Sequence, residues 1–190
     1  MCVRPLQINL SGNYIQEHEA VAIGDALKQN RSLRSVDLSY NKLGIKGSRA
    51  IADAVRVHPS LTWLDTRVNN ITGKDADNLA GAILANETLQ VFGRVPLLML
   101  RSNTITDLDL RGAAIGPTEA IVLARLAAYC PVLRALDVRK NALSETDTKR
   151  LRLGMKAAKG SLRDFALHLD EVAWSSSPWS KPRAVFAMPK

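Results

Sequence analysis

The sequence predicts an α/β fold: a short solenoid of about six to seven parallel strands on a concave face, with helices on the convex face. The first observation is a phrase of alternating apolar residues, Leu33 to Leu43, that recurs along the chain. The second is the constant spacing of its copies, and the third is an alanine-rich helical phrase after each of the first three. Such repeats bury their apolar faces by stacking on their neighbours.

Within the phrase Leu33 to Leu43, the apolar strand residues point inward. Ser35, Asp37 and Ser39 alternate onto the opposite, open face. Asn41 stands where the chain leaves the strand, so we expect its amide to bond backbone groups that no neighbouring strand reaches.

The copies of this phrase are evenly spaced. The strand position of Val36 recurs at intervals of 28 residues, and a last copy follows at Phe165 after 29 residues. A period of this length accommodates a strand, a turn and a helix. The other copies are Ile8, Leu64 and Phe92, followed by Leu108 and Leu136.

The phrases between the strands predict helices that lay an apolar stripe on the strand layer. Ile51 and Val55 illustrate the i, i+4 spacing of this stripe. Pro117 suits a first helical turn, and Ser144 with Asp147 resembles a capping box for the last helix. The helices expected before that one span residues 19–28, 47–57, 74–85 and 118–129.

The fourth unit departs from the pattern, because only 16 residues separate its strand from the next one. This length excludes a three-turn helix with its two connections. We expect a helix-poor short unit at residues 93–107, with no helix of its own, in which Leu97, Leu98 and Leu100 fill the convex side. The resulting opening in the helical layer is either a docking notch or an inert feature of a shortened repeat.

The repeats predict a solenoid domain over residues 1–170, followed by a proline-containing tail over residues 171–190. Trp174, Trp179 and Phe186 give the tail large apolar anchors, although its composition does not predict a packed core. The tail either folds back over the open end of the array or inserts into a partner.

The pattern L-x-x-L-x-L-x-x-N-x-L resembles leucine-rich repeats of the ribonuclease-inhibitor type, similar to the arrays of Ran GTPase-activating proteins and NOD-like receptors. The resemblance covers roughly residues 5–168 and implies a curved solenoid used mainly for protein binding. A GTPase-regulating role is implied by this analogy alone, and no activating or inhibitory residue carries over. The departures are the short fourth unit and Ala113 in place of an asparagine.

Charged residues recur on the open face of the strands. Because neighbouring strands lie about 4.8 Å apart, a row of carboxylates repels unless cations pair with it. The row serves either structural pairing or partner recognition, and a metal site is disfavoured because its oxygens would have to converge. We expect no metal and no cofactor. The candidate residues are Asp65, Asp109 and Asp137, with Arg67, Arg111 and Arg139 two positions later.

Trp63 occupies the open-face position between Ser35 and Val91 and is the candidate centre of a concave binding surface. The alternative for this ring is a cation–π contact with a neighbouring arginine.

The net charge of +8 predicts an acidic partner surface, on a protein, on RNA or on a membrane face. A basic patch of Lys149, Arg152, Lys156 and Lys159 lies along one side of the last helix. It is either a solvated helix face or a binding surface for an acidic protein or RNA, although no stacking aromatics interleave with it.

Enzyme functions are not predicted. The histidines show no spacing typical of a metal pair or a nucleophile–base couple, and no phosphate-binding glycine motif is present. Two cysteines predict a reducing, intracellular setting, in the cytoplasm or in an organelle if a presequence has been removed. No apolar run is long enough to span a membrane. The sequence therefore predicts a non-catalytic scaffold protein, an accessory subunit of a larger assembly with other proteins as partners.

Overall fold

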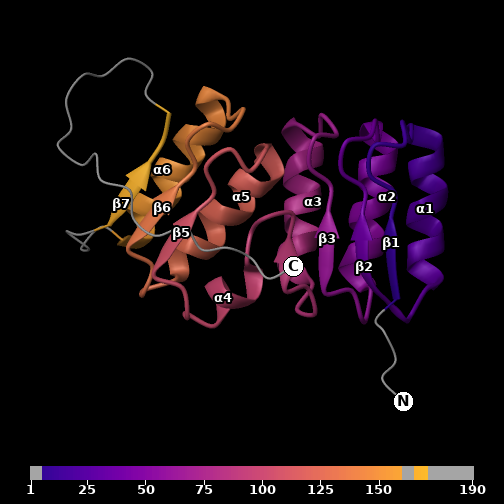
Figure 1. Cartoon of the computed structure of the whole chain (residues 1–190), viewed down its shortest axis with the longest axis horizontal. Coiled ribbons are helices and arrows are strands. Elements are labelled where there is room, and N and C mark those ends of the chain that lie inside the picture. The colour runs from indigo at the N-terminus through magenta and orange to yellow at the C-terminus, as the bar shows by residue number, and fades with distance from the viewer. Residues whose placement is uncertain (1–5, 160–164, 171–190) are drawn as a thin grey trace.

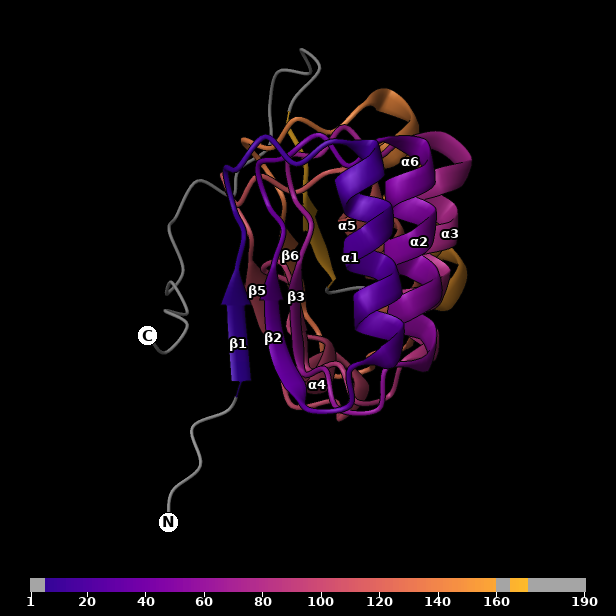
Figure 2. The same cartoon turned by 90° about the vertical axis from the view of Figure 1, so that its right-hand side faces the viewer.

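The computed structural model describes residues 6–159 and 165–170, and it confirms a short α/β solenoid. Strands form one layer and helices stack beside them as a second layer (Figures 1 and 2). The elements in order are β1 (Leu6–Asn9), α1 (Glu17–Gln29), β2 (Leu33–Asp37), α2 (Gly44–Val57), β3 (Trp63–Asp65), α3 (Gly73–Ala85), β4 (Val91–Phe92), α4 (Leu97–Arg101), β5 (Asp107–Asp109), α5 (Pro117–Leu126), the 3-10 helix η1 (Ala127–Tyr129), β6 (Ala135–Asp137), α6 (Glu145–Lys159) and β7 (Ala166–His168).

The strands form two parallel sheets, one of β1-β2-β3-β4 and one of β5-β6-β7. The 28-residue spacing sets the register, because Val36 lies opposite Ile8 on one side and Leu64 on the other. Leu108 lies opposite Leu136 in the second sheet. The core fills the space between strands and helices with these inward residues and with the helical stripe that includes Ile51 and Val55.

The asparagine turn is confirmed. The Asn41 amide donates to the carbonyls of Leu10 (2.9 Å) and Leu38 (3.0 Å), and its Oδ1 accepts the backbone N–H of Ile15 (3.0 Å). Asn69 and Asn141 occupy the same place in their repeats and make equivalent bonds. The side chain thus fastens each turn to the preceding repeat.

The short unit differs from the expectation in two ways. It contains a helix, the five-residue α4, where none was expected, although a three-turn helix is indeed missing. Leu97 and Leu100 are buried, whereas Leu98 is 52% exposed and does not fill the convex side.

The expected opening in the helical layer is also wrong. Helix α5 packs directly against α3, while α4 lies at one end of these two helices (Figure 1). An ion pair from Arg150 of α6 to Asp77 of α3, 3.0 Å long, joins the two halves further. The interruption lies in the strand layer, where β4 and β5 do not pair.

Arg101 of α4 makes this closure feasible. Its guanidinium donates to the carbonyls of Leu89 (2.8 Å), Ile83 (3.2 Å), Leu84 (3.3 Å) and Asn86 (3.1 Å). Two of these carbonyls belong to the last turn of α3, where a helix leaves its acceptors without partners. One side chain thereby does what an asparagine of the next full repeat does elsewhere.

The expected capping box of the last helix is confirmed, because Ser144 donates its N–H to Asp147 Oδ2 at 3.0 Å and Asp147 donates its N–H to Ser144 Oγ at 3.2 Å. Over residues 6–159 and 165–170, the structure contains no helix with the length and apolar character needed to cross a membrane. The tail anchors Trp174, Trp179 and Phe186 lie outside the described residues.

Candidate functional site

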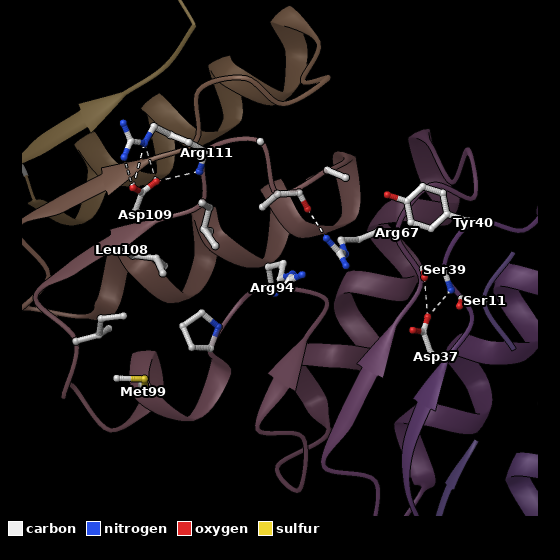
Figure 3. Close-up of a pocket in the computed structure, with 16 residues that line it drawn as sticks. Ser11, Asp37, Ser39, Tyr40, Arg67, Arg94, Met99, Leu108, Asp109 and Arg111 are labelled. Carbon is white, nitrogen blue, oxygen red and sulfur yellow. Dashed lines mark hydrogen bonds and ion pairs between the residues drawn. The ribbon is translucent and has the colours of Figure 1, made fainter. Parts of the chain in front are cut away.

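The interruption between β4 and β5 opens a groove of about 720 Å³ on the strand side of the molecule (Figure 3). One wall comes from the turns that follow β2 and β3, and the other comes from β5 and its turn. The short unit supplies the floor. Residues that characterise the lining are Tyr40, Arg67, Arg94, Met99, Leu108 and Arg111.

The expected pairing of carboxylates with arginines is present beside this groove. Arg111 Nη2 lies 2.5 Å from Asp109 Oδ2, and Arg139 Nη2 lies 2.6 Å from Asp137 Oδ2. A longer contact of 3.5 Å joins Arg111 Nε to Asp137 and links the two strands. The charges are therefore neutralised mainly within each strand and its turn, and recognition of a partner by these residues stays a prediction.

Arg67 makes the same pair with Asp65, at 2.6 Å, in a different environment. Its side chain is only 11% exposed, and that of Asp65 only 2%. The guanidinium also donates from Nη1 to the Ala113 carbonyl on the opposite wall (Figure 3). Burial lowers the pKa of Arg67, but the hydrogen bond and the charge of Asp65 raise it further, so the net pKa is raised. Arg67 therefore braces the two sheets as a cation.

Glu119, in the first turn of α5, is a buried carboxyl close enough to this brace to be affected by its charges. Its Oε2 accepts the backbone N–H of Gly116 at 3.0 Å, while Oε1 has no partner among the described residues. Burial, with the nearby charge of Asp65, raises the pKa of Glu119 to about 7. Sequence reasoning missed this residue, although the spacing of Gly116, Pro117 and Glu119 is that of a helix start.

Arg94 is exposed in the turn that joins β4 to α4, and it lies over the middle of the groove in Figure 3. It makes no ion pair with any described residue. The preceding Gly93 has φ of +56°, and a Cβ there would meet Arg67 Cδ at 3.0 Å. Sequence reasoning missed Arg94 because it lies in the irregular unit, where no repeat position draws attention to it.

The comparisons with known proteins agree with this architecture. The family model described as "Leucine Rich repeat" matches residues 29–52, which cover β2, its turn and the first part of α2. The chain carries leucine-rich repeats. A search of curated proteins found no match. Repeats of this kind are generally modules for protein–protein interaction rather than catalysis, and the ribonuclease-inhibitor type stays a prediction.

Two turns of the leucine-rich repeats place large exposed side chains in left-handed backbone. Tyr40 has φ of +55° and is 56% exposed, and Val68 has φ of +58° and is 47% exposed. This conformation costs a residue with a Cβ roughly 1–2 kcal/mol, and Tyr40 lies at the rim of the groove. Both residues sit where a partner in the groove would meet them.

Trp63 lies where the sequence placed it, on β3 between Ser35 of β2 and Val91 of β4. It is half-buried and does not line the groove. Among the described residues, the cation–π contact found is that of Lys42 with Tyr14, at 5.7 Å from the ring centroid, so the arginine contact expected for Trp63 is not seen there. Its role at the centre of a concave surface stays a prediction.

On α6, Lys149, Arg152 and Lys156 are exposed, whereas Leu151 and Met155 face the core as expected. The side chain of Lys159 lies outside the described residues.

The described histidines form no catalytic arrangement with one another. His58 is buried, and its Nδ1 accepts the backbone N–H groups of Ser60 and Leu61 at 3.3 and 3.1 Å. This is the task that Asn86 performs one repeat later for Leu89. Within the described part of the chain, no cluster of three or more histidine, cysteine or acidic side chains suits a metal ion.

Proposed function

We propose that the protein is a non-catalytic binding protein, a scaffold or accessory subunit of a larger assembly, that holds a protein partner in the groove between its two sheets. The observation that carries the proposal is the groove itself, because an uninterrupted array of leucine-rich repeats has no such break in its strand layer.

The chemistry of the groove supports this function. Elsewhere on the open face, the arginines are consumed by the carboxylates two residues earlier. In the groove, Arg94 keeps its charge available, Tyr40 presents an exposed ring, and Met99 offers an adaptable apolar surface. Tyrosine and arginine are enriched among the residues that dominate binding energy at protein interfaces.

The test is affinity purification with mass spectrometry, comparing the wild-type chain with Arg94→Glu. Arg94 is exposed and unpaired among the described residues, so its reversal should leave the fold intact. Lys156→Glu is the matched control, because it makes the same charge change at a distant exposed site. We expect the partner to be lost with Arg94→Glu and kept with Lys156→Glu. Retention of the same partner by both variants would reject the groove as the binding site.

RNA binding is a second candidate function, supported by three exposed cations of α6 that form no ion pair with a described carboxylate. Binding to RNA through this patch should weaken steeply as salt rises, because phosphate contacts release counterions. We expect a variant with Lys149, Arg152 and Lys156 changed to glutamate to lose RNA binding. Equal binding by this variant would exclude the patch.

Two finer expectations need separate assays. A chain ending at Asp170 tests whether the tail anchors contribute to partner binding, since it removes Trp174, Trp179 and Phe186. A turnover assay with candidate GTPases tests the regulator role, which rests on the family resemblance alone.

A further inference from the structure

We propose that the groove receives an extended, acidic segment of the partner protein as an added strand, which pairs with the unoccupied edge of β5. This inference rests on the proposed function and specifies how the partner binds.

The repeat pattern shows which hydrogen bonds β5 lacks. In three strands, the carbonyl of the aspartate accepts an N–H from the preceding strand at 2.8 Å. Asp109 holds the same position in β5, but its preceding strand β4 does not pair with β5. No described backbone group donates to the Asp109 carbonyl. The three regular bonds run from Leu10 to Asp37, from Leu38 to Asp65 and from Leu110 to Asp137.

The donor side of the edge is equally open. Ala135 donates its N–H to the Thr106 carbonyl at 3.2 Å, and Asp107 is the residue of β5 at the same repeat position. Because backbone groups alternate between the two sides of a parallel strand, Thr106 and Leu110 bond toward β6. Asp107 and Asp109 therefore direct their N–H and C=O groups into the interruption, where no described residue meets them.

The opposite side of the interruption is closed by the short unit itself. Phe92 and Val95 exchange backbone hydrogen bonds of 3.0 and 2.8 Å, and Leu98 donates its N–H to Gln90 at 3.0 Å. The edge of β4 is thus satisfied by its own chain. A segment entering the groove can pair only with β5, which makes strand addition the fitting mode of recognition.

The lining determines the chemistry of the segment. Pro96, Met99 and Leu108 form an apolar floor that can accept alternate side chains of an extended peptide. The charged lining residues are three arginines and two aspartates, a net charge of +1, on a chain of net charge +8. Since Asp109 already pairs with Arg111, the available charge is that of Arg94 above the floor. An acidic side chain beside a β-branched or aromatic one meets both requirements.

The first experiment selects random linear peptides on the full-length protein and measures the affinity of the enriched peptides. We expect acidic, β-branched sequences without central proline. Asp107→Pro blocks the edge but leaves the β6 bonds of Thr106 and Leu110 in place, and proline is tolerated at such an edge. We expect it to weaken binding about tenfold or more, as a lost pair of backbone hydrogen bonds implies. The control Asp107→Ala, which removes the carboxylate but keeps the N–H, should bind as the wild type does.

The second experiment methylates each backbone nitrogen of an enriched peptide in turn. Strand addition predicts that affinity falls at alternate positions only, because every second N–H faces β5. Uniform tolerance of methylation, equal binding by Asp107→Pro, or no enrichment of acidic peptides would overturn the proposal. So would binding only to a chain ending at Asp170, or a dimer that Asp107→Pro dissociates, because the occupant would then be the protein's own tail or a second copy. If Arg94→Glu still loses the cellular partner in any of these cases, the proposed function stands and only the strand-addition mode fails.

Discussion

The second repeat and the short fourth unit solve the same packing problem with very different lengths of chain. In the regular repeats, the loop that follows α2 is fastened by Asn86, whose amide donates to the carbonyls of Val55 (2.6 Å) and His58 (3.0 Å). In the short unit, Arg101 reaches back to the end of α3 instead. Because one long side chain replaces a whole turn of contacts, the helical layer stays closed. Backbone pairing has no such substitute, so the strand layer is interrupted.

The interruption also changes the meaning of a shared motif. Asp65 and Arg67, at the break, are nearly buried, whereas Arg111 and Arg139, in the second sheet, are substantially exposed. The same Asp-x-Arg spacing therefore forms a structural brace in one sheet and a solvated pair in the other. The following predictions test this contrast, from the largest expected effect to the smallest.

Arg67→Ala should have the largest effect. It leaves the buried Asp65 carboxylate without its cation and removes the bond to Ala113, so the free energy of unfolding should fall by roughly 3–5 kcal/mol. Arg139→Ala removes an exposed partner and should change it by less than about 1 kcal/mol. Urea denaturation measures both values. Equal losses would mean that the brace between the sheets is no stronger than a surface pair.

Glu119→Gln should change how stability depends on pH. Burial raises the pKa of Glu119 to about 7 in the folded state, so folding favours its neutral form. Wild-type stability is then fully present below the unfolded pKa near 4.5 and is lost as pH rises through about 7. Glutamine keeps the acceptor for Gly116 and cannot ionise, so by pH 8 it should gain about 3 kcal/mol over the wild type. Unfolding curves at several pH values measure the difference, and a constant difference would show that the carboxyl titrates normally.

Arg101→Ala tests the closure of the helical layer. It leaves four carbonyls at the end of α3 without their donor, and we expect a loss of about 2–3 kcal/mol. Arg101→Lys keeps the charge but not the fork of donors, so it should recover only part of the loss. Asn86→Ala is the matched variant in a regular repeat. If Arg101→Ala were silent while Asn86→Ala destabilised the protein, the short unit would close by another means.

His58→Asn should have the smallest effect. The pKa of His58 is lowered by burial and by the charge of Arg31, so the folded state favours the neutral ring. Its stability contribution is present above the unfolded pKa near 6.5 and is lost as pH falls through the lower folded value. Asparagine supplies the same acceptor, as at Asn30 and Asn86. The variant should match the wild type at neutral pH and lose less stability in acid, as followed by circular dichroism, and parallel pH curves would contradict this role.

The repeat spacing predicted most of the fold, since a fixed period places Val36, Leu64 and Leu136 on one buried row and Asn41 at each turn. It failed where the period failed. Sixteen residues are compatible with an open helical layer or with an open strand layer, and the choice depends on where Arg101 finds its acceptors.

The site was predicted in part. The spacing of aspartates and arginines revealed the pairs, because both lie on one face of a strand and its turn. It did not reveal that Arg67 is buried, because burial follows from the approach of the second sheet. Arg94 and Glu119 hold no repeat position, so only tertiary structure brings them to the groove and to the brace.

The most direct test of the interrupted strand layer is amide hydrogen exchange of the free full-length protein, resolved by residue. Asp107 and Ala135 hold the same position in successive repeats, but only Ala135 has a strand before it. We predict that the amide protons of Asp107 and Asp109 exchange rapidly, while those of Ala135 and Asp137 are protected. Equal protection of the two pairs would show that β5 already has a neighbour, and would contradict the open edge on which the binding proposal depends.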